Sequence, residues 1–155
     1  MWVYACLLQL IALTFDLKEE KKISLNSNFC ILGKSDVRDI SFAQREFYIL
    51  FDQTEYPIQT FSREGTLIRC VVQKDLLNEV RFFCLDQQLH IIVTDGSTTQ
   101  VKILSNEGKL IAQFGEKGPA AGKFTNIRGV AVYDVGTIIT VGEKDHNTLQ
   151  AFSLT

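Results

Sequence analysis

Few residues in this sequence could carry catalysis, and their spacing does not assemble a reaction centre. The two histidines stand apart, His90 in an apolar run and His146 in a polar turn, whereas a metal site usually needs three or four convergent ligands. The four cysteines, at positions 6, 30, 70 and 84, are too widely spaced for paired zinc ligands. No serine, histidine and aspartate set indicates nucleophilic catalysis. We therefore predict a chain that is not an enzyme and that holds neither a metal nor a cofactor.

A glycine-rich segment at 115–123, Gly-Glu-Lys-Gly-Pro-Ala-Ala-Gly-Lys, is only superficially similar to a phosphate-binding loop. No glycine lies five residues before Gly122, and Phe124 stands where a serine or threonine would hold Mg²⁺. No helix is predicted after it, so no helix dipole would face a phosphate. We interpret this segment as a connection between repeated units.

Composition restricts the class of protein that these residues could serve. The chain has 155 residues, of which 46% are hydrophobic and 22% charged, with a formal net charge of −2. This length suits one domain with a substantial core, and the apolar content excludes a disordered chain. The near-neutral charge argues against general nucleic-acid binding. We expect the cysteines to be reduced, buried thiols in a cytosolic protein.

The apolar start of the chain has two interpretations. Residues 2–15 have the length of a signal-peptide core, but no lysine or arginine precedes Lys18 and 14–16 form a poor cleavage site. The alternative is a pair of buried strands, at 3–7 and 9–16. The repeat described next favours the strands.

Strand-like runs recur along the whole chain. Apolar runs at 46–51, 89–93 and 137–141 each lead into a polar turn and then into an alternating strand, at 58–61, 101–104 and 149–152. Tight turns ending in Gly65 and Gly108 connect two of these to a further strand. Residues 75–80 could form one helical turn or a loop.

The runs define a repeated unit. Arg38, Arg81 and Arg128 each open a unit and lie 43 and 47 residues apart, and acidic residues close the second strands at Asp52, Asp95 and Glu143. Four antiparallel strands per 40–50 residues are typical of a β-propeller blade. We predict an all-β, partial propeller of about four blades: 1–34, 35–77, 78–123 with its connection, and 124–155 without its last strand. In the first blade, the third and fourth strands would lie at 21–26 and 29–32. Second strands should be apolar on both faces, whereas third strands should alternate.

Residues 80–155 resemble NHL repeats, as found in malin-like and tripartite-motif proteins, and residues 35–77 resemble them more weakly. The resemblance rests on Val-Thr-Asp at 93–95, the glycine hairpin ending at Gly108, Phe-Gly at 114–115, Gly-Lys-Phe at 122–124 and Gly-Val-Ala-Val at 129–132. It departs from the pattern at Ile127, where a proline is usual, and at Gly142-Glu143, where an Asp is usual. Family members usually carry six blades, so the resemblance implies a fragment, a truncated product or a ring completed by another chain. Self-association through open blade edges is a further expectation.

The resemblance implies a protein-recognition module, the substrate-binding part of a RING-type E3 ubiquitin ligase in the cytoplasm. The partner would be a protein or a ubiquitination substrate, the RING would lie outside these residues, and no membrane would be involved. In a propeller, the loops that open each blade share one rim with the turns between second and third strands. We therefore predict a partner-binding rim formed by six residues: Arg38, Tyr56, Arg81, Thr98, Arg128 and His146.

Three alternatives remain open for these residues. The first is binding of single-stranded RNA in post-transcriptional regulation, although the acidic residues near the arginines would weaken it. The second is a metal-dependent propeller lyase with His146 beside Glu143 and Asp145. The third is purely structural: each arginine would pair with an aspartate to hold neighbouring blades together, and Asp52 and Asp95 would cap turns.

Overall fold

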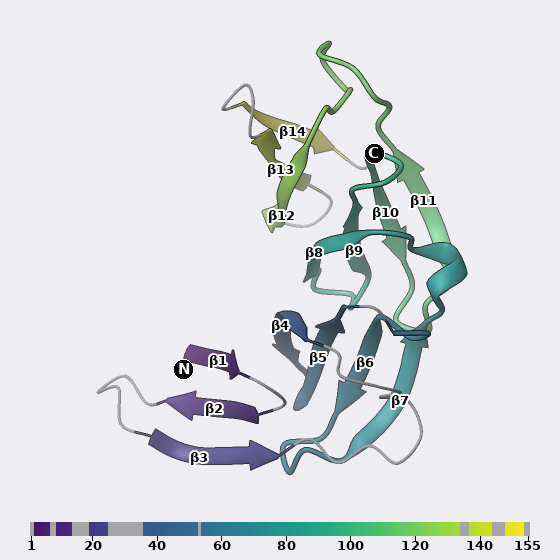
Figure 1. Cartoon of the computed structure of the whole chain (residues 1–155). Helices are drawn as coiled ribbons and strands as arrows, with labels where there is room; N and C mark the ends of the chain where they lie inside the picture. Colours follow the sequence, from purple (N-terminus) through teal and green to yellow (C-terminus); the bar gives the residue numbers. More distant parts are fainter. Residues whose placement is uncertain are drawn as a thin grey trace. The chain divides into compact units, whose positions relative to one another are not determined.

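The computed structural model describes the backbone of residues 2–6, 9–13, 19–24, 36–52, 54–133, 137–143 and 148–153, and the side chains of 36–52, 54–133 and 148–153. The chain is all-β and divides into two compact units, Met1–Gln73 and Lys74–Thr155 (Figure 1). In the described residues, no helix is long and apolar enough to cross a membrane.

The first unit contains two antiparallel sheets. The first sheet has strands β1 (Trp2–Cys6), β2 (Gln9–Leu13) and β3 (Glu19–Ser24), in that order. The second is a four-stranded meander of β4 (Val37–Ala43), β5 (Glu46–Phe51), β6 (Ile58–Phe61) and β7 (Leu67–Val72). Strand β1 contacts β4. The predicted strand at 29–32 lies outside the described residues.

The second unit repeats this plan. After a 3-10 turn at Lys74–Leu76, strands β8 (Val80–Leu85), β9 (Ile91–Asp95), β10 (Gln100–Leu104) and β11 (Leu110–Phe114) form another four-stranded meander. Strands β12 (Ile127–Tyr133), β13 (Thr137–Glu143) and β14 (Leu149–Ser153) form a three-stranded sheet, and β12 contacts β8 and β9. This 3-10 turn lies at the start of residues 75–80, the segment for which the sequence predicted either one helical turn or a loop.

The two four-stranded sheets share the same turn between their third and fourth strands. In the first, Gly65 has φ +86° and its amide donates to the Ser62 carbonyl at 3.0 Å. In the second, Gly108 has φ +83° and its amide donates to the Ser105 carbonyl at 2.9 Å. This left-handed conformation favours glycine. The prediction of glycine hairpins at both positions is confirmed.

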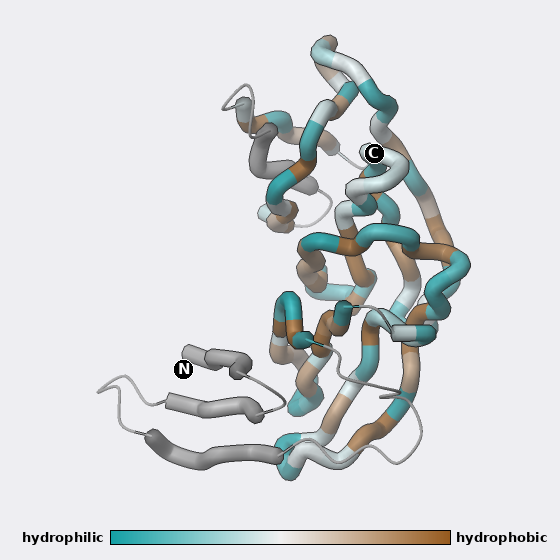
Figure 2. Tube along the Cα trace, in the orientation of Figure 1, coloured by the Kyte–Doolittle hydropathy of each residue, from teal (hydrophilic) through white to brown (hydrophobic). Residues whose placement is uncertain are grey.

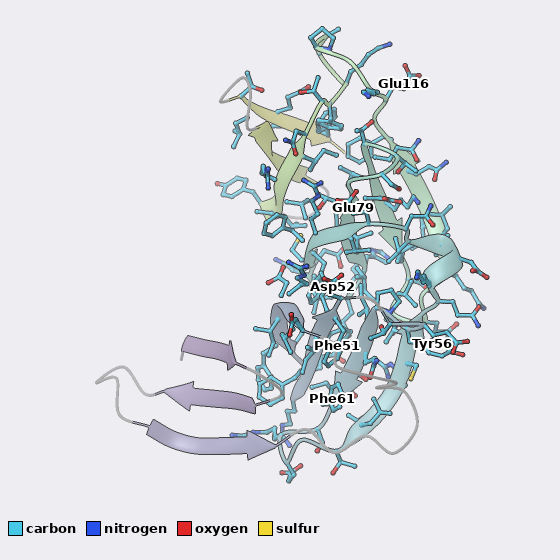
Figure 3. The ribbon with its side chains drawn as sticks, viewed as in Figure 1. Phe51, Asp52, Tyr56, Phe61, Glu79 and Glu116 are labelled. Carbon is cyan, nitrogen blue, oxygen red and sulfur yellow. The ribbon has the colours of Figure 1, made fainter. Side chains whose placement is uncertain are left out.

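Each unit has its own apolar core on a sheet face. In the first unit, Phe47, Ile49, Phe51 and Phe61 are buried on one face of the β4–β7 sheet; Figure 3 shows Phe51 and Phe61, whose ring centroids are 6.1 Å apart. In the second unit, the core lies between the β8–β11 and β12–β14 sheets. It contains Ile92, Val101, Ile103, Phe124 and Ile127, with Phe152 packed against them.

The second strands are buried on both faces, as predicted. Every residue from Phe47 to Phe51 and from Ile91 to Asp95 is buried, and the apolar colouring of Figure 2 follows these strands. The prediction that third strands alternate in exposure was wrong for β6 and β10. Gln59, Thr60 and Lys102 are buried as well, and Lys102 lies against Asp95 and the Leu76 carbonyl of the segment before β8.

The cysteine prediction also requires a correction. Cys70, on β7, is disulfide-bonded, whereas Cys84, on β8, is a reduced, half-buried thiol packed against the core of the second unit. Disulfides persist mainly in oxidising compartments. The expectation that all four thiols are reduced therefore fails at Cys70, and the argument for a cytosolic protein loses this support.

Candidate functional site

The second unit gathers polar side chains at the end of its four-stranded sheet where β8 begins and β9 ends. The Arg81 Nη2 atom donates to Glu79 Oε1 at 2.6 Å, and its Nη1 donates to Asn126 Oδ1 at 3.0 Å. Asn126 directly precedes β12, so this guanidinium connects the four-stranded sheet to the start of the next one. We call Glu79, Arg81, Asn126 and the turn 96–99 the Arg81 cluster.

Close packing fixes the Arg81 guanidinium over the turn 96–99. A Cβ atom at Gly96 would lie 2.6 Å from Arg81 Nε and 3.2 Å from Glu79 Cδ, so a larger residue here would displace the guanidinium from its position over the turn. The Gly96 amide also donates to the Glu79 carbonyl at 2.8 Å. Thr98 is exposed in the same turn. The structure therefore brings Arg81 and the turn carrying Thr98 together.

A buried ion pair lies beneath this turn. Lys102 Nζ contacts Asp95 Oδ2 at 2.7 Å and also donates to the Leu76 carbonyl at 2.8 Å. The exposed fractions of the two side chains are 8% for Lys102 and 0% for Asp95. The other Asp95 oxygen, Oδ1, accepts from the Ser97 hydroxyl at 2.8 Å and from the Ser97 and Glu79 amides. Asp95 thus caps the turn, as the sequence suggested, and also anchors Lys102.

This environment determines the charge state of Asp95. Burial alone raises the pKa of a carboxyl group, but the hydrogen bonds from Lys102 and Ser97 favour its ionised form. Their combined effect lowers the pKa of Asp95 to about 2. Asp95 therefore remains ionised near neutral pH and fixes the turn that presents Thr98.

In the first unit, the corresponding residues make a simpler arrangement. Arg38, on β4, forms an ion pair with Asp52, which directly follows β5 in the same sheet. The Phe51 amide donates to the Pro57 carbonyl at 2.8 Å and closes the intervening loop. Tyr56 lies half-buried in this loop, and its carbonyl accepts from Gln59 Nε2 at 3.0 Å.

The arginines only partly fit the structural alternative in which each pairs with an aspartate of a neighbouring unit. The Arg38–Asp52 pair joins two strands of one sheet, and Arg81 pairs with a glutamate of its own sheet. Among the arginines of the described residues, only Arg81 makes a side-chain hydrogen bond to the next sheet, and its partner there is the amide of Asn126. The physical reason is distance. Arg38 reaches Asp52 because β4 and β5, the first and second strands, are direct neighbours in the sheet.

Arg128 and His146 complete the six predicted rim residues. Arg128 is exposed on β12, two residues after Asn126. His146 lies outside the described residues. Arg81, Thr98 and Arg128 therefore belong to one end of the second unit, whereas Arg38 and Tyr56 belong to the first.

Several residues of this site were not identified from the sequence. Glu79 and Asn126 precede predicted strands and carry no motif, so sequence spacing alone could not connect them to Arg81. Lys102 left a weak signal, because it is a lone charge in the apolar run Val101–Leu104, seven residues after Asp95.

The remaining histidine takes part in a local turn. His90 Nδ1 lies 2.7 Å from Asp86 Oδ2, and Asp86 Oδ1 accepts from the His90 and Gln88 amides at 2.8 Å each. Across the described part of the chain, no three histidine, cysteine or acidic residues come together as metal ligands. His90 is half-buried and directly precedes β9, whereas the sequence placed it within the second strand.

The comparisons with known proteins concern the fold alone. No protein-family model matches the sequence, and no curated protein matches it. The chain is similar to the crystal structure of a protein of unknown function from Bacteroides caccae, with a TM-score of 0.52 and 8% identity. That match covers 95% of this chain and 54% of the other, so this chain spans about half the length of that protein.

A second solved structure has a similar fold. The computationally designed Ika4 protein matches with a TM-score of 0.55 and 8% identity, over 99% of this chain and 89% of the other. At this level of identity the likeness shows a shared fold and no shared function. The chain is thus an all-β protein with two four-stranded antiparallel sheets, and its function must be argued from its own surface.

Proposed function

We propose that this chain is part of an NHL-type β-propeller and acts as a protein-recognition module. The Arg81 cluster, with exposed Thr98 and Arg128, forms the centre of its binding surface. The chain acts by binding rather than by catalysis. Its setting is that of the substrate-binding part of a RING-type ubiquitin ligase, with the RING supplied by other residues or another chain.

One observation carries this proposal: the Arg81 cluster is accessible yet held in a fixed conformation. The exposed fractions of the Arg81 and Glu79 side chains are 30% and 51%, while three hydrogen bonds and the contact with Gly96 hold the guanidinium in place. Below the turn, Asp95 and Lys102 prevent it from rearranging. Groups fixed before binding lose less conformational entropy when a partner docks, so such a surface suits recognition.

The repeated sheets support the propeller assignment. Both four-stranded sheets are meanders with the same glycine turn, their second strands are buried on both faces, and β12 contacts β8 and β9. Stacked antiparallel sheets of this size are the building units of propellers. The NHL assignment adds the sequence pattern at 93–132 to this arrangement.

Charge favours a protein over an RNA partner. Arg81 is paired with Glu79, and Arg38 is paired with Asp52. Paired arginines release few counterions from a phosphate backbone, so they contribute little to RNA affinity. Mixed charge with exposed hydroxyls and amides is instead typical of the polar part of protein interfaces.

The test is a selection of displayed peptides on the immobilised full-length chain, followed by affinity measurements with variants. Arg128→Glu and Thr98→Arg change exposed side chains of the proposed surface. Lys109→Glu serves as the matched control, because Lys109 is 81% exposed and lies before β11, far along the sheet from the turn 96–99. Selected peptides should lose at least about tenfold in affinity with the first two variants and none with the control.

Two results would contradict this proposal. Peptides that bind all three variants equally would show that the Arg81 cluster is not the binding surface. Tight binding of a single-stranded RNA that collapses between 50 and 200 mM salt would instead support the RNA-binding alternative.

A further inference from the structure

The Arg81 guanidinium has more hydrogen-bond donors than its contacts within the chain use. A guanidinium carries five N–H donors, and Arg81 uses three of them: Nε and Nη2 donate to Glu79 Oε1, and Nη1 donates to Asn126 Oδ1. Within the described part of the chain, the other two N–H groups, one on Nη1 and one on Nη2, have no acceptor. The side chain is 30% exposed, so a docked partner can supply the missing acceptors.

A second, unpaired guanidinium belongs to the same end of the unit. Arg128 is exposed on β12 and makes no ion pair or hydrogen bond with any residue that the structure describes. Its Cα atom lies at most about 7 Å from that of Asn126, whose side chain bonds to Arg81. Arg128 shares one face of β12 with Val130 and Val132, which pack against the core between β12 and the β8–β11 sheet. Strand β12 also contacts β8, which carries Arg81, so Arg128 lies on the side of β12 that faces Arg81.

Paired charges leave this arrangement with one positive charge. Glu79 neutralises Arg81, and the buried Asp95 neutralises Lys102 beneath the turn 96–99. Arg128 has no counterion among the described residues, so a partner group with a single negative charge is the electrostatic complement. A phosphate dianion would bring a second negative charge close to Glu79, whose side chain is 51% exposed, and like charges at short distance repel each other.

We propose that the Arg81 cluster and Arg128 recognise a partner protein through a single carboxylate. This carboxylate accepts hydrogen bonds from the two remaining N–H donors of Arg81 and pairs with Arg128. It comes from an acidic side chain or from a chain terminus. The inference rests on the proposed function, because it names the chemical group that the partner presents to the same surface. An RNA strand fits less well, since every nucleotide carries a charge and Arg128 alone is unpaired.

Fixed donors make such a contact effective. Hydrogen bonds to charged groups are roughly twice as strong as neutral ones, and guanidinium groups commonly bind carboxylates through two donors. The Arg81 guanidinium is already held by Glu79, Asn126 and the packing against Gly96, so it loses little conformational entropy on binding. We therefore expect that replacing the partner's carboxylate by an amide weakens binding at least about tenfold, which is about 1.4 kcal/mol.

Four libraries of short peptides, attached to beads by their N-termini, test this inference with the full-length chain at physiological salt. All flanking positions are random but exclude Asp and Glu. The libraries differ in the central residue and the C-terminus: Asp with an amidated end, Asn with an amidated end, Asn with a free carboxylate, and phosphoserine with an amidated end. Binding should concentrate in the single-carboxylate libraries, and the comparison between these two identifies a side chain or a chain terminus as the source.

Isothermal titration calorimetry on the best single-carboxylate peptides and their amide analogues then identifies the residue that pairs with the carboxylate. The wild type should prefer the carboxylate at least about tenfold, and Arg128→Gln should reduce this preference by at least about threefold. The matched control is Lys109→Gln, which removes an 81% exposed positive charge outside the Arg81 cluster and should keep the full preference. Circular dichroism checks folding, and Arg128→Ala replaces Arg128→Gln if the latter unfolds.

The failure of this inference is distinguishable from the failure of the proposed function. If no peptide binds, or if the binders lose no affinity with Thr98→Arg or Arg128→Glu, the proposed binding surface is wrong and the inference falls with it. If peptides bind at this surface without preferring a carboxylate to an amide, or with a preference unchanged in Arg128→Gln, only the inference is overturned. Tighter binding of phosphoserine peptides would also overturn it, because the site would then accept a second negative charge.

Discussion

The buried pair of Asp95 and Lys102 offers the sharpest test of the structure. Replacing Lys102 by methionine keeps most of the length of the side chain but removes its charge, so it leaves an ionised carboxylate without its main partner. Neither side chain is substantially accessible, with 0% of Asp95 and 8% of Lys102 exposed. Breaking such a buried pair typically costs about 3–5 kcal/mol of unfolding free energy.

The pH dependence gives a second measure of the same pair. The pKa of Asp95 is lowered from 3.8 to about 2, which corresponds to a stabilisation from Asp95 on the order of 2 kcal/mol. Because the folded-state pKa is lowered, this stabilisation is complete above about pH 4 and is lost as the pH falls through 2. In Lys102→Met the pKa of Asp95 should rise, so the loss of stability over this pH window should become smaller.

Urea unfolding followed by circular dichroism at pH 7 and at several values between pH 5 and 2 measures both effects. The matched control is Lys109→Met, whose lysine is 81% exposed and pairs with an exposed Glu107. Exposed pairs contribute about 0–1 kcal/mol, so this variant should remain close to the wild type at every pH. The variant Asp95→Asn/Lys102→Met, which carries neither charge, should be more stable than Lys102→Met.

One outcome would refute this reasoning. If Lys102→Met and Lys109→Met lost the same stability at pH 7 and showed the same pH dependence, the Asp95–Lys102 pair would not be the buried anchor of the turn 96–99. The argument that the Arg81 cluster is held in place before binding would then lose the Asp95–Lys102 pair as its support.

Three further predictions concern the second unit. Phe124→Ala should lower the unfolding free energy by about 3–5 kcal/mol in urea denaturation, because Phe124 is 2% exposed in the core between two sheets. Gly115→Ala should destabilise by more than about 1 kcal/mol in the same assay, because its φ is +98° and a Cβ would lie 2.6 Å from Phe124 Cε2; an unchanged midpoint would contradict this. Gln150→Ala should speed amide hydrogen exchange in the 115–124 loop, where Gln150 Oε1 accepts from Gly122 N at 2.8 Å and Gln150 Nε2 donates to the Lys123 carbonyl at 2.9 Å. This loop, with Glu116 labelled in Figure 3, should otherwise stay protected.

Much of the fold could be predicted because its signals are local. The apolar runs at 46–51 and 89–93 and the glycine turns at 65 and 108 identify strands and hairpins from neighbouring residues alone. Their repetition after 43 residues then indicates a repeated sheet. The error about β6 and β10 arose because exposure depends on which residues cover each face of the sheet, and local alternation does not contain that information.

The site was predicted less completely. Arg81 and Thr98 came from their positions at the ends of predicted strands, and the structure places Arg81 directly over the turn that contains Thr98. Asn126 lies 45 residues from its partner Arg81, and nothing in its own surroundings marks it. The disulfide at Cys70 was missed because wide cysteine spacing says nothing about distances in the folded chain.

The sequence by itself determined the strand-and-turn order, since periodicity and glycine conformations act over a few residues. Only the tertiary structure decided which polar groups became a buried anchor and which became an exposed cluster. These outcomes depend on contacts between residues far apart in the chain, where desolvation and distance set the energy of each group.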